Sequence, residues 1–328
     1  MVISKTPLRM SFFGGGSDFE QYFKKSKFGY GSTIGTTIDM YVYITVNKRF
    51  DGRIRLVYNE SELVDSVEEI KHNIIRNALK IVGIEGGVEI IYMADMPIAG
   101  VGIGLASSSA LSVGVLNALH AYKGEYVTKD QLAKEACHLE IDMMGQPIGI
   151  QDQNAVAHGG FNRYRFYKDG SIGVEPVICD NETIQKLKSN LMLFFTGITR
   201  DSGTVLGEQK SNIDDRIKQL DDLVVSVDEA YSHLNIKDID IWGEMFDKAW
   251  QTKKMLANKI SNKEIDKMYN DAMNAGALGG KVLGAGGGGF LLMYVPKENQ
   301  KDVKEALSDY KLVDFSFDSF GTQIIFKN

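Results

Sequence analysis

The sequence has few cysteines, few prolines and no long apolar run. Only Cys137 and Cys179 occur among 328 residues, together with 5 prolines. Two lone cysteines provide no disulfide framework, which is typical of a reducing compartment. No apolar run approaches the roughly 20 residues that a membrane span needs. The first ten residues, MVISKTPLRM, lack the apolar core of a signal peptide. We therefore expect a cytoplasmic protein that does not bind a membrane.

Positive charge in excess is also missing. The formal net charge is -6, so the composition excludes a broad nucleic-acid-binding face. The 5 histidines show no zinc-ligand spacing, and no G-x-S-x-G motif supports a serine hydrolase. Hydrophobic residues make up 44% and charged residues 24%, which is typical of a globular protein. Any phosphate that this chain binds is therefore expected at a local site.

Strand and helix patterns are mixed along the chain. Residues 1–60 alternate in the manner of strands, and helical patterns follow near 66–83, 107–122 and 128–144. Long helical stretches cover much of 203–276, and a glycine run then leads into an apolar strand. This order favours an α+β fold over a doubly wound sheet. The length favours two domains, which we place at residues 1–185 and 186–328.

One loop combines glycines and serines in front of an apolar helix. The stretch PIAGVGIGLASSSALSVGVLNAL, residues 97–119, contains Gly100, Gly102 and Gly104 and then three serines, Ser107–Ser109. The first N–H groups of a helix lack partners within the helix, and glycines let a preceding loop curl around an anion. The stretch therefore predicts a phosphate site, or else a serine helix cap with turn glycines. It is not a Walker A loop, because it contains no lysine.

A second glycine run, KVLGAGGGGFLLMYV, contains Gly284, Gly286 and Gly289 at G-x-G-x-x-G spacing. A dinucleotide fingerprint must open a helix, whereas this run leads into a strand-like segment. Two interpretations remain, namely close approach of the backbone to a ligand or another loop, and a tight turn between two strands.

Two carboxylates flank a rigid turn. Glu140 lies on the helix that ends near Gly145, and Asp152 follows Pro147 and Gly149. Oxygen ligands of this type suit Mg²⁺, which usually shares phosphate oxygens. Solvated surface or local capping is the alternative for each acid.

An arginine lies in an apolar, strand-like segment near the N-terminus. Arg9 occurs in TPLRMSFF, and Asp18 follows three glycines. Such an arginine is either paired with a carboxylate or directed at an anion.

Three segments in this order resemble the GHMP kinases, a family of small-molecule kinases. They are TPLRMSFFGGGSDF, GIGLASSSA and KVLGAGGGGF. The resemblance spans nearly the whole chain. It implies an N-terminal half like the second domain of ribosomal protein S5 and a ferredoxin-like C-terminal half, with the active site between them. It also implies ATP and Mg²⁺ as cofactors and a small molecule as the phosphoryl acceptor.

The resemblance assigns roles to residues of this sequence. The serines would both cap the helix and bind the nucleotide, and Ser108 and Glu140 would hold Mg²⁺. Asp152 would face the acceptor hydroxyl. Arg9 would hold Asp152 in place and contact the transferred phosphoryl group. The nucleotide contacts would be Gly100, Gly102, Gly104, Leu105, Ala106, Ser107, Ser108 and Ser109. The acceptor contacts would be Arg9, Gly15, Gly16, Ser17, Asp18, Asp152, Gly286, Gly287, Arg163 and Arg200.

Two features depart from the family pattern. Ala106 stands where the family usually has glycine before the serines, and the stretch 97–104 is about three residues longer than usual. Either departure can change nucleotide affinity or the order of the loop.

Further segments resemble the subgroup that phosphorylates heptose 7-phosphate. They are GSTIGTTIDMYVYITV, LMLFFTGITRDSGTVLGEQ and AGALGGKVLGAGGGGFLL. This resemblance implies transfer from ATP to the anomeric hydroxyl of D-glycero-D-manno-heptose 7-phosphate, giving the 1,7-bisphosphate for GDP-heptose and surface glycans. Arg163, Arg165, Arg200 and Lys48 are candidates for the cationic pocket that a phosphorylated substrate needs, or else are surface charges.

Two other functions stay open, a kinase of another free sugar and a kinase-like sugar sensor without turnover. The oligomeric state is expected to be a monomer or a homodimer.

Overall fold

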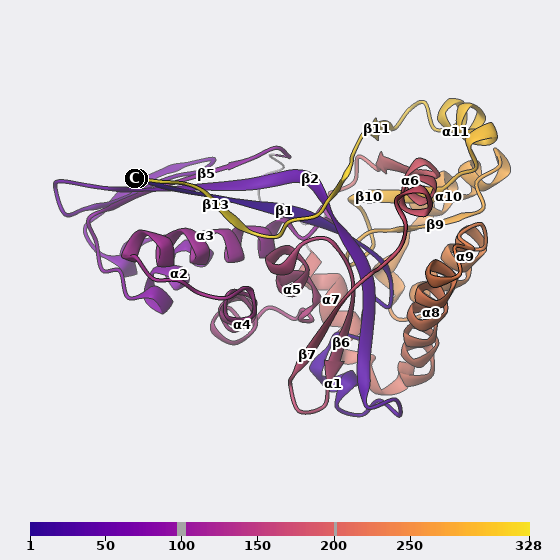
Figure 1. Cartoon of the computed structure of the whole chain (residues 1–328), viewed down its shortest axis with the longest axis horizontal. Coiled ribbons are helices and arrows are strands. Elements are labelled where there is room, and N and C mark those ends of the chain that lie inside the picture. The colour runs from indigo at the N-terminus through magenta and orange to yellow at the C-terminus, as the bar shows by residue number, and fades with distance from the viewer. Residues whose placement is uncertain (97–102, 200–201) are drawn as a thin grey trace.

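The computed structural model describes residues 1–96, 103–199 and 202–328. It shows the expected α+β architecture, with two sheets and helices packed against both (Figure 1). The strands are β1 (Val2–Phe13), β2 (Tyr30–Lys48), β3 (Ile54–Val57), β4 (Ser61–Val64), β5 (Val88–Ala94), β6 (Phe161–Tyr167), β7 (Ile172–Pro176), β8 (Leu191–Phe195), β9 (Gly279–Val282), β10 (Phe290–Tyr294), β11 (Lys311–Val313), β12 (Phe317–Asp318) and β13 (Gln323–Lys327). The α-helices are α1 (Glu20–Phe23), α2 (Asn73–Val82), α3 (Ser107–Lys123), α4 (Lys129–Cys137), α5 (Gln151–His158), α6 (Asn181–Ser189), α7 (Ser202–Ser211), α8 (Ile217–Asn235), α9 (Trp242–Lys254), α10 (Lys263–Asn274) and α11 (Gln300–Ala306).

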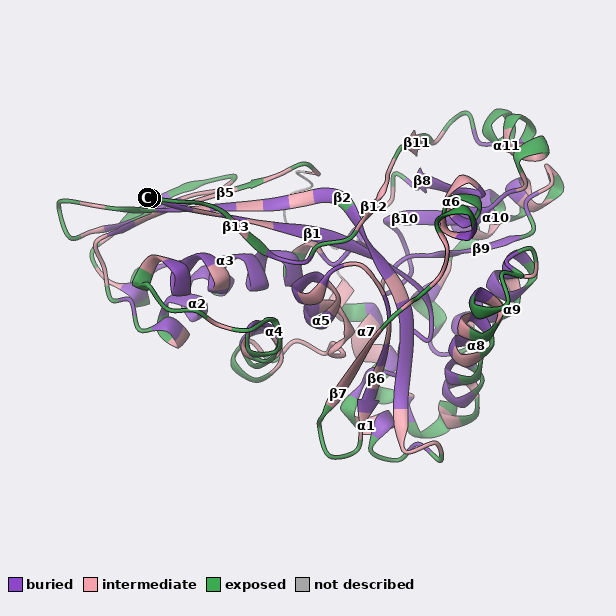
Figure 2. Cartoon of the chain, in the orientation of Figure 1, coloured by how far each residue is buried: buried purple, intermediate pink, exposed green. Residues whose placement is uncertain are grey.

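The first sheet is built on β1 and the 19-residue strand β2. Its main path runs β13-β1-β2-β5-β3-β4. One half of β2 pairs with β5, and the other half pairs with β6, which continues into the β6–β7 hairpin. All pairs are antiparallel except β3 with β5. Because β1 and β2 are buried along most of their length, this sheet forms the centre of the molecule (Figure 2).

Helices α2, α3, α4 and α5 lie together on one side of the first sheet (Figure 1). Helix α3 packs directly on β1 and β2 and is buried over most of its residues. It is apolar around most of its circumference, as expected for a helix enclosed by other elements. Helix α2, by contrast, has one apolar face, which covers α3. This arrangement fixes the start of α3 close to the middle of β1.

The second sheet is antiparallel, in the order β11-β8-β10-β9. Numbered by appearance in the chain, this is the order 4-1-3-2, with helices between the first and second strands and between the third and fourth. That connectivity is the ferredoxin-like βαββαβ pattern. Helix α9 packs on β9 and α8, and α8 also contacts β1 and β2. The predicted two-part fold is therefore confirmed.

The end of the chain returns to the first sheet. Strand β12 pairs with β2, and β13 pairs with β1. The two termini meet, since the Met1 ammonium donates to the Asn328 carbonyl at 3.0 Å. The division at residues 185 and 186, which we retain as a proposal, falls inside α6. A division by sheet would assign residues 317–327 to the first half.

Four segments differ from the sequence expectation. A turn was expected at Pro147 and Gly149 with Asp152 just past it, and no helix was predicted there, but α5 begins at Gln151. Helix α6 was not predicted at all. The expected helix at 66–83 is shorter, because a 3₁₀ turn at Val67–Glu69 precedes α2. The 203–235 stretch is two helices, α7 and α8, separated by a short 3₁₀ segment.

Candidate active site

The start of α3 is open to solvent. Ser108 is exposed and Ser107 is half-buried, so nothing in the described chain covers them fully. The N–H groups of the first turn, at Ser107–Ser109, have no acceptor inside the helix, and the helix dipole adds partial positive charge there. The expectation that a serine caps the helix is wrong, because the N-cap is Ala106. The three serines instead occupy the first turn.

Ala106 has a left-handed backbone, with φ +61° and ψ +33°. This conformation costs an L-residue roughly 1–2 kcal/mol, whereas glycine adopts it without that cost. The departure from the family pattern therefore carries a physical cost at the position where the loop turns into the helix. Among the described residues only Lys237 shares a positive φ without being glycine.

Glu140 joins the serines of α3 to α5. Its carboxylate accepts hydrogen bonds from the Ser108 and Ser109 hydroxyls at 2.8 Å each and from the Gln153 amide at 2.5 Å. It lies in a π-helical turn, His138–Met143, of the kind often found at functional sites. Glu140 is 1% exposed, and burial raises the pKa of its carboxyl group. The three donors partly offset this rise by favouring the ionised form.

Arg9 on β1 links the acidic start of α5 to the loop before α3. Its Nη2 donates to both oxygens of Asp152 at 2.6 Å, and its Nε donates to Oδ1 at 2.9 Å. Its Nη1 donates to the carbonyl of Gly104 at 2.8 Å. The Arg9 side chain is 4% exposed, whereas the Asp152 side chain is 28% exposed. Arg9 thus holds a partly accessible carboxylate beside the open end of α3.

Asp18 caps α5 from a distant part of the sequence. Its carboxylate accepts from the backbone N–H of Gly16 at 3.0 Å and of Gln151 at 3.2 Å, and from the Gln151 amide at 3.1 Å. Burial raises the pKa of Asp18, and the negative charge of Asp152 raises it further. Asp18, which the sequence predicts to bind the sugar, therefore also fixes the helix that carries Asp152.

A small cavity lies between the two halves of the chain. It is lined by Arg9, Gly16, Asp18, Phe19, Ile148, Gly149, Gln151, Asp152, Leu206, Gln209, Lys253, Gly284 and Ala285. Arg9, Asp18 and Asp152 were predicted from the sequence. Gln209 on α7 is the last residue of LMLFFTGITRDSGTVLGEQ, one of the segments that resemble the heptose subgroup, but it was assigned no role. Lys253 on α9 was missed because it lies in a helical stretch without a motif.

Three buried basic side chains, Arg9, Lys253 and Lys281, gather beside this cavity. The ammonium of Lys253 donates to the Gly15 carbonyl at 2.9 Å. That of Lys281 on β9 donates to the Ser11 and Phe12 carbonyls at 2.8 and 3.0 Å. Burial lowers the pKa of Lys281, and the charges of Lys253 and Arg9 lower it further. The site therefore combines positive charge from both halves with the carboxylates of Asp18 and Asp152.

The second glycine run packs against the loop before α3. A Cβ on Gly104 would lie 2.4 Å from the Leu283 carbonyl oxygen, and one on Gly284 would lie 2.6 Å from the Gly104 Cα. The N–H of Gly287 donates to the Ile260 carbonyl at 2.6 Å. The glycines thus allow backbone to approach another loop. Gly284 lines the cavity, but the substrate roles of Gly286 and Gly287 stay predictions.

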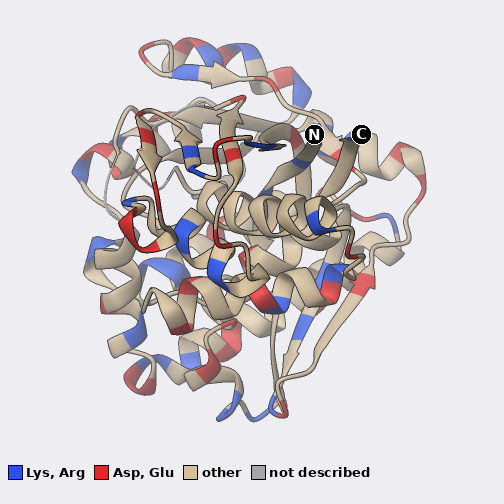
Figure 3. Ribbon diagram, turned by 90° about the vertical axis from the view of Figure 1, so that its left-hand side faces the viewer, with Lys and Arg blue, Asp and Glu red and all other residues tan. Residues whose placement is uncertain are grey.

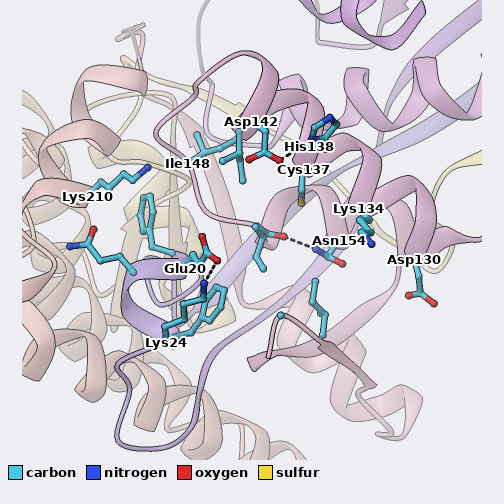
Figure 4. Close-up of a pocket in the computed structure, with 17 residues that line it drawn as sticks. Glu20, Lys24, Asp130, Lys134, Cys137, His138, Asp142, Ile148, Asn154 and Lys210 are labelled. Carbon is cyan, nitrogen blue, oxygen red and sulfur yellow. Dashed lines mark hydrogen bonds and ion pairs between the residues drawn. The ribbon is translucent and has the colours of Figure 1, made fainter. Parts of the chain in front are cut away.

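A larger cavity of ≈ 840 Å³ adjoins the small one, since Phe19 and Ile148 line both. Its wall includes α1, α4, the π-helical turn and Asn154 of α5 (Figure 4). In that view Lys210 and Lys134 lie on different sides of the cavity, and Lys24 pairs with Glu20.

Arg163 and Arg165 lie in an ion-pair network between the β6–β7 hairpin and α8. Arg163 bonds to Glu175 and Asp228, and its guanidinium stacks on Tyr231 at 3.8 Å. Arg165 donates to Glu175 at 3.0 Å. Arg163 is paired through all three of its guanidinium nitrogens, whereas Arg165 Nε has no partner among the described residues. A role of either arginine in phosphate binding stays a prediction.

Three further predictions can be placed in the structure. Lys48 lies eleven residues along β2 from Thr37, the register partner of Arg9, which is roughly 36 Å at about 3.3 Å per residue. It is therefore remote from the site. The Ser17 hydroxyl lies 2.8 Å from both the Gly14 and the Ser32 carbonyl oxygens and can donate to either. It is wholly buried, so it shapes the turn. Gly100, Gly102 and Arg200 lie outside the described residues.

Ser108 and Glu140 present hard oxygen donors side by side, which is the donor type that Mg²⁺ takes. Within the described residues, no group of three or more His, Cys, Asp or Glu side chains is arranged to hold a metal ion. A Mg²⁺ ion that is bound mainly through phosphates and water needs only one or two protein ligands, so the pair fits that ion.

Basic and acidic residues are interspersed along the ribbon (Figure 3). No helix in the described part of the chain has the length and apolar character to cross a membrane.

An open helix start, a buried acid beside it and an arginine-held carboxylate across a cavity define a small-molecule kinase. Residues 68–160 match the family described as GHMP kinases N terminal domain, and residues 230–311 match GHMP kinases C terminal. Together the matches cover more than half of the chain, which therefore belongs to the GHMP kinase family. It is a phosphotransferase that uses ATP.

Relatives support this assignment over nearly the full length. A D-glycero-alpha-D-manno-heptose 7-phosphate kinase of Campylobacter jejuni is 29% identical over 98% of both chains. A galactokinase of Pyrococcus furiosus is 26% identical over 96% of this chain and 95% of its own. The crystal structure of a D-glycero-D-manno-heptose 1-phosphate kinase from Bacteriodes thetaiotaomicron matches with a TM-score of 0.81, 23% identity and full coverage of both chains. That structure shows the shared fold.

Proposed function

We propose that this protein transfers the γ-phosphoryl group of ATP to the anomeric hydroxyl of D-glycero-D-manno-heptose 7-phosphate, giving the 1,7-bisphosphate. The observation that carries the proposal is the Arg9 bridge, which joins the Asp152 carboxylate to the Gly104 carbonyl of the loop before α3. It brings the group that would face an acceptor hydroxyl next to the helix start that would bind phosphates.

The residues divide the work of phosphoryl transfer, which depends mainly on positioning and charge stabilisation. The N–H groups at Ser107–Ser109 bind nucleotide phosphates. Asp152 orients the acceptor hydroxyl and accepts its proton. Arg9 holds Asp152 and adds positive charge beside the transferred group. An anomeric hydroxyl is more acidic than an ordinary alcohol, so a modest base is enough.

Ser108 and Glu140 would hold Mg²⁺. The ion, when bound, neutralises charge on the phosphate oxygens. Glu140 is ready for this role because three donors already fix its carboxylate. Gln153 positions Glu140 from α5, the helix that also carries Asp152. Glu140 and Asp152 are therefore both positioned by helix α5.

Two observations support a heptose phosphate as the acceptor. The Campylobacter jejuni relative, which matches over nearly the full length of both chains, is named for that substrate. The ≈ 840 Å³ cavity beside Phe19 gives room for an acceptor longer than a hexose, and it offers the Lys134 and Lys210 ammonium groups. We further propose that the enzyme acts in the cytoplasm and supplies GDP-heptose for surface glycans.

The deciding experiment measures ADP release with ATP, Mg²⁺ and a panel of acceptors. The panel contains D-glycero-D-manno-heptose 7-phosphate, D-mannose, D-galactose and L-fucose. We expect the highest kcat/KM with the heptose phosphate, and a product whose new phosphorus signal couples to the anomeric proton. Preference for an unphosphorylated sugar would assign the protein to another free-sugar kinase activity. Binding without turnover would make it a sensor.

A further inference from the structure

A buried amide from the C-terminal half lines the cavity that contains Asp18 and Asp152. Gln209 on α7 is 2% exposed, yet its Nε2 has no hydrogen-bond partner within the described part of the chain. Its other amide atom, Oε1, accepts from the Lys253 ammonium at 3.2 Å. Because this bond fixes the carbonyl end of the amide, the two N–H donors are directed away from Lys253.

Gly16 lies between this amide and Asp18. Its backbone N–H donates to Asp18 Oδ1 at 3.0 Å, and a Cβ built on it would lie 2.2 Å from Gln209 Nε2. A residue with any side chain at position 16 would therefore block the amide. The donor of Gln209 and the acceptor of Asp18 thus line the same small cavity on either side of a glycine.

Leaving a buried amide donor without a partner costs free energy, and native proteins rarely do so without a reason. A sugar hydroxyl supplies what is missing here, because it can donate to Asp18 and accept from Gln209 at once. A site that satisfies both lone pair and proton of a hydroxyl discriminates strongly against analogues without that hydroxyl.

We propose that Gln209, oriented by Lys253, is a specificity residue that donates a hydrogen bond to a hydroxyl of the acceptor sugar next to Asp18. The inference rests on the proposed sugar kinase activity and deepens it. It makes α7 and α9 part of the acceptor site, whereas the acceptor contacts assigned from the sequence in the C-terminal half are Gly286, Gly287 and Arg200.

The first test compares Gln209→Leu with the wild type. Leucine keeps the volume of the side chain and removes its donors. We expect kcat/KM for the acceptor to fall by roughly 10- to 100-fold, with the KM for ATP unchanged within threefold. Gln251→Leu on α9 is the matched control, since its amide already has a protein partner, Asp247, at 2.9 Å. That variant should behave as the wild type.

The second test separates recognition from a structural role. Monodeoxy analogues of the acceptor are compared in the wild type and in Gln209→Leu. The wild type should lose most with one analogue, and the variant should lose little further with that same analogue. Gln209→Glu keeps the shape and should also lower acceptor kcat/KM. Equal losses for every analogue in both proteins, or equal losses of ATP and acceptor affinity, would overturn the inference.

The proposed function fails separately from this inference. If another sugar replaces the heptose phosphate as the preferred acceptor, the proposed substrate is wrong, and the same comparison is made with the sugar that is used. If the wild type turns over no sugar, calorimetric binding of heptose 7-phosphate in the presence of a non-hydrolysable ATP analogue replaces kcat/KM. Absence of any sugar binding would contradict both proposals.

Discussion

At the scale of single residues, Asp152 must be both firmly held and accessible to a substrate. It lies in the first turn of α5, where a helix dipole favours a negative charge, and it is held by the Arg9 guanidinium. Its side chain nevertheless stays 28% exposed toward the cavity. A carboxylate fixed on one side and accessible on the other is suited to orient a hydroxyl.

Asp152→Asn is expected to lower kcat by about 10²- to 10⁴-fold, the range of general-base contributions. The amide keeps the size of the side chain but loses its charge and one acceptor for Arg9. The KM for ATP should change by less than threefold, because the nucleotide binds at α3. Steady-state kinetics at saturating heptose 7-phosphate measure both, and Asp302→Asn on the surface helix α11 is the control. Unchanged turnover would remove Asp152 from the reaction.

Ala106 offers a prediction about stability at the phosphate loop. Its φ of +61° is strained for alanine, whereas glycine adopts it freely but is less constrained in the unfolded chain. The net effect of Ala106→Gly should be an increase of about 0.5–1 kcal/mol in the free energy of unfolding. Urea denaturation measures it. Ala306→Gly at the end of α11 is the helical counterpart and should lower stability. A destabilised Ala106→Gly would contradict the strain argument.

Asp18 predicts a pH dependence of acceptor use. Its pKa is raised above the ordinary 3.8, first by burial and then by Asp152. Since the ionised form accepts sugar hydroxyls, kcat/KM for the acceptor should fall as the pH is lowered through that raised value. Asp18→Asn should show about 10- to 100-fold lower kcat/KM at neutral pH and should lack this acidic limb.

The same pKa fixes the sign of a stability effect. As the pH rises above 3.8, an unfolded Asp18 releases its proton before the folded one does. The free energy of unfolding should therefore decrease until the raised pKa is passed, and Asp18→Asn should lack this decrease. Urea titrations across this pH range measure it. If the fall in acceptor kcat/KM at low pH persists in Asp18→Asn, it belongs to another titrating group.

At the scale of elements, the loop before α3 and the glycine turn after β9 meet backbone to backbone. Gly104→Ala would place a Cβ 2.4 Å from the Leu283 carbonyl oxygen at a φ of +84°. We expect a loss of about 3 kcal/mol or more in stability, together with a higher KM for ATP. Gly170→Ala is a matched control, because Gly170 has the same φ of +84° and nothing within 4 Å of its Cβ position.

The difference between these two variants isolates the contact from the backbone strain. Gly170→Ala should cost only about 1–2 kcal/mol and leave ATP kinetics unchanged. Equal losses in both variants would mean that the loop and the turn do not depend on each other.

The sequence marks the start of α3 more clearly than the cavity that contains Asp18 and Asp152. Helix α3 is marked by its glycines, serines and apolar run, and Arg9, Glu140 and Asp152 are marked by the motifs around them. Helix α5 was missed because QDQNAVAH is short and polar and follows a proline and a glycine. Part of its start is stabilised by Asp18, 133 residues earlier in the chain. A contact between such distant residues leaves no local pattern.

Side chains that come together only in the folded chain could not be assigned to the site from the sequence either. Gln209 and Lys253 meet across two helices, and neither spacing nor composition around them indicates a site. Arg163 shows the reverse case. The sequence suggested a free cation for a phosphate, whereas in the folded chain Arg163 is already paired with Glu175 and Asp228. Which charges are already paired depends on tertiary structure.

At the scale of the whole molecule, the last strands connect the two halves. After β11 the chain leaves the second sheet, and β12 and β13 complete the first. The buried Thr322 hydroxyl bonds to the Thr6 hydroxyl at 2.8 Å and accepts from the Asn117 amide at 3.0 Å. In the other direction, Trp242 of α9 packs on Phe13 of β1, with ring centroids 5.1 Å apart. The halves therefore share one core.

Removal of residues 315–328 should consequently destabilise the entire chain. The deletion exposes the edge of β1 and takes away Phe317, whose ring lies 6.2 Å from that of Phe12. Losing about 3–4 kcal/mol should lower the unfolding midpoint by roughly 5 °C. Both tryptophans, Trp242 and Trp250, lie on α9, so their fluorescence reports on the C-terminal half while circular dichroism reports on the whole chain. We expect the two transitions to shift together, and Ile325→Ala, at a half-exposed position on β13, to leave both nearly in place. A tryptophan transition that stays unchanged after the deletion would show that the halves unfold independently, because α9 would then not depend on the first sheet against which it packs.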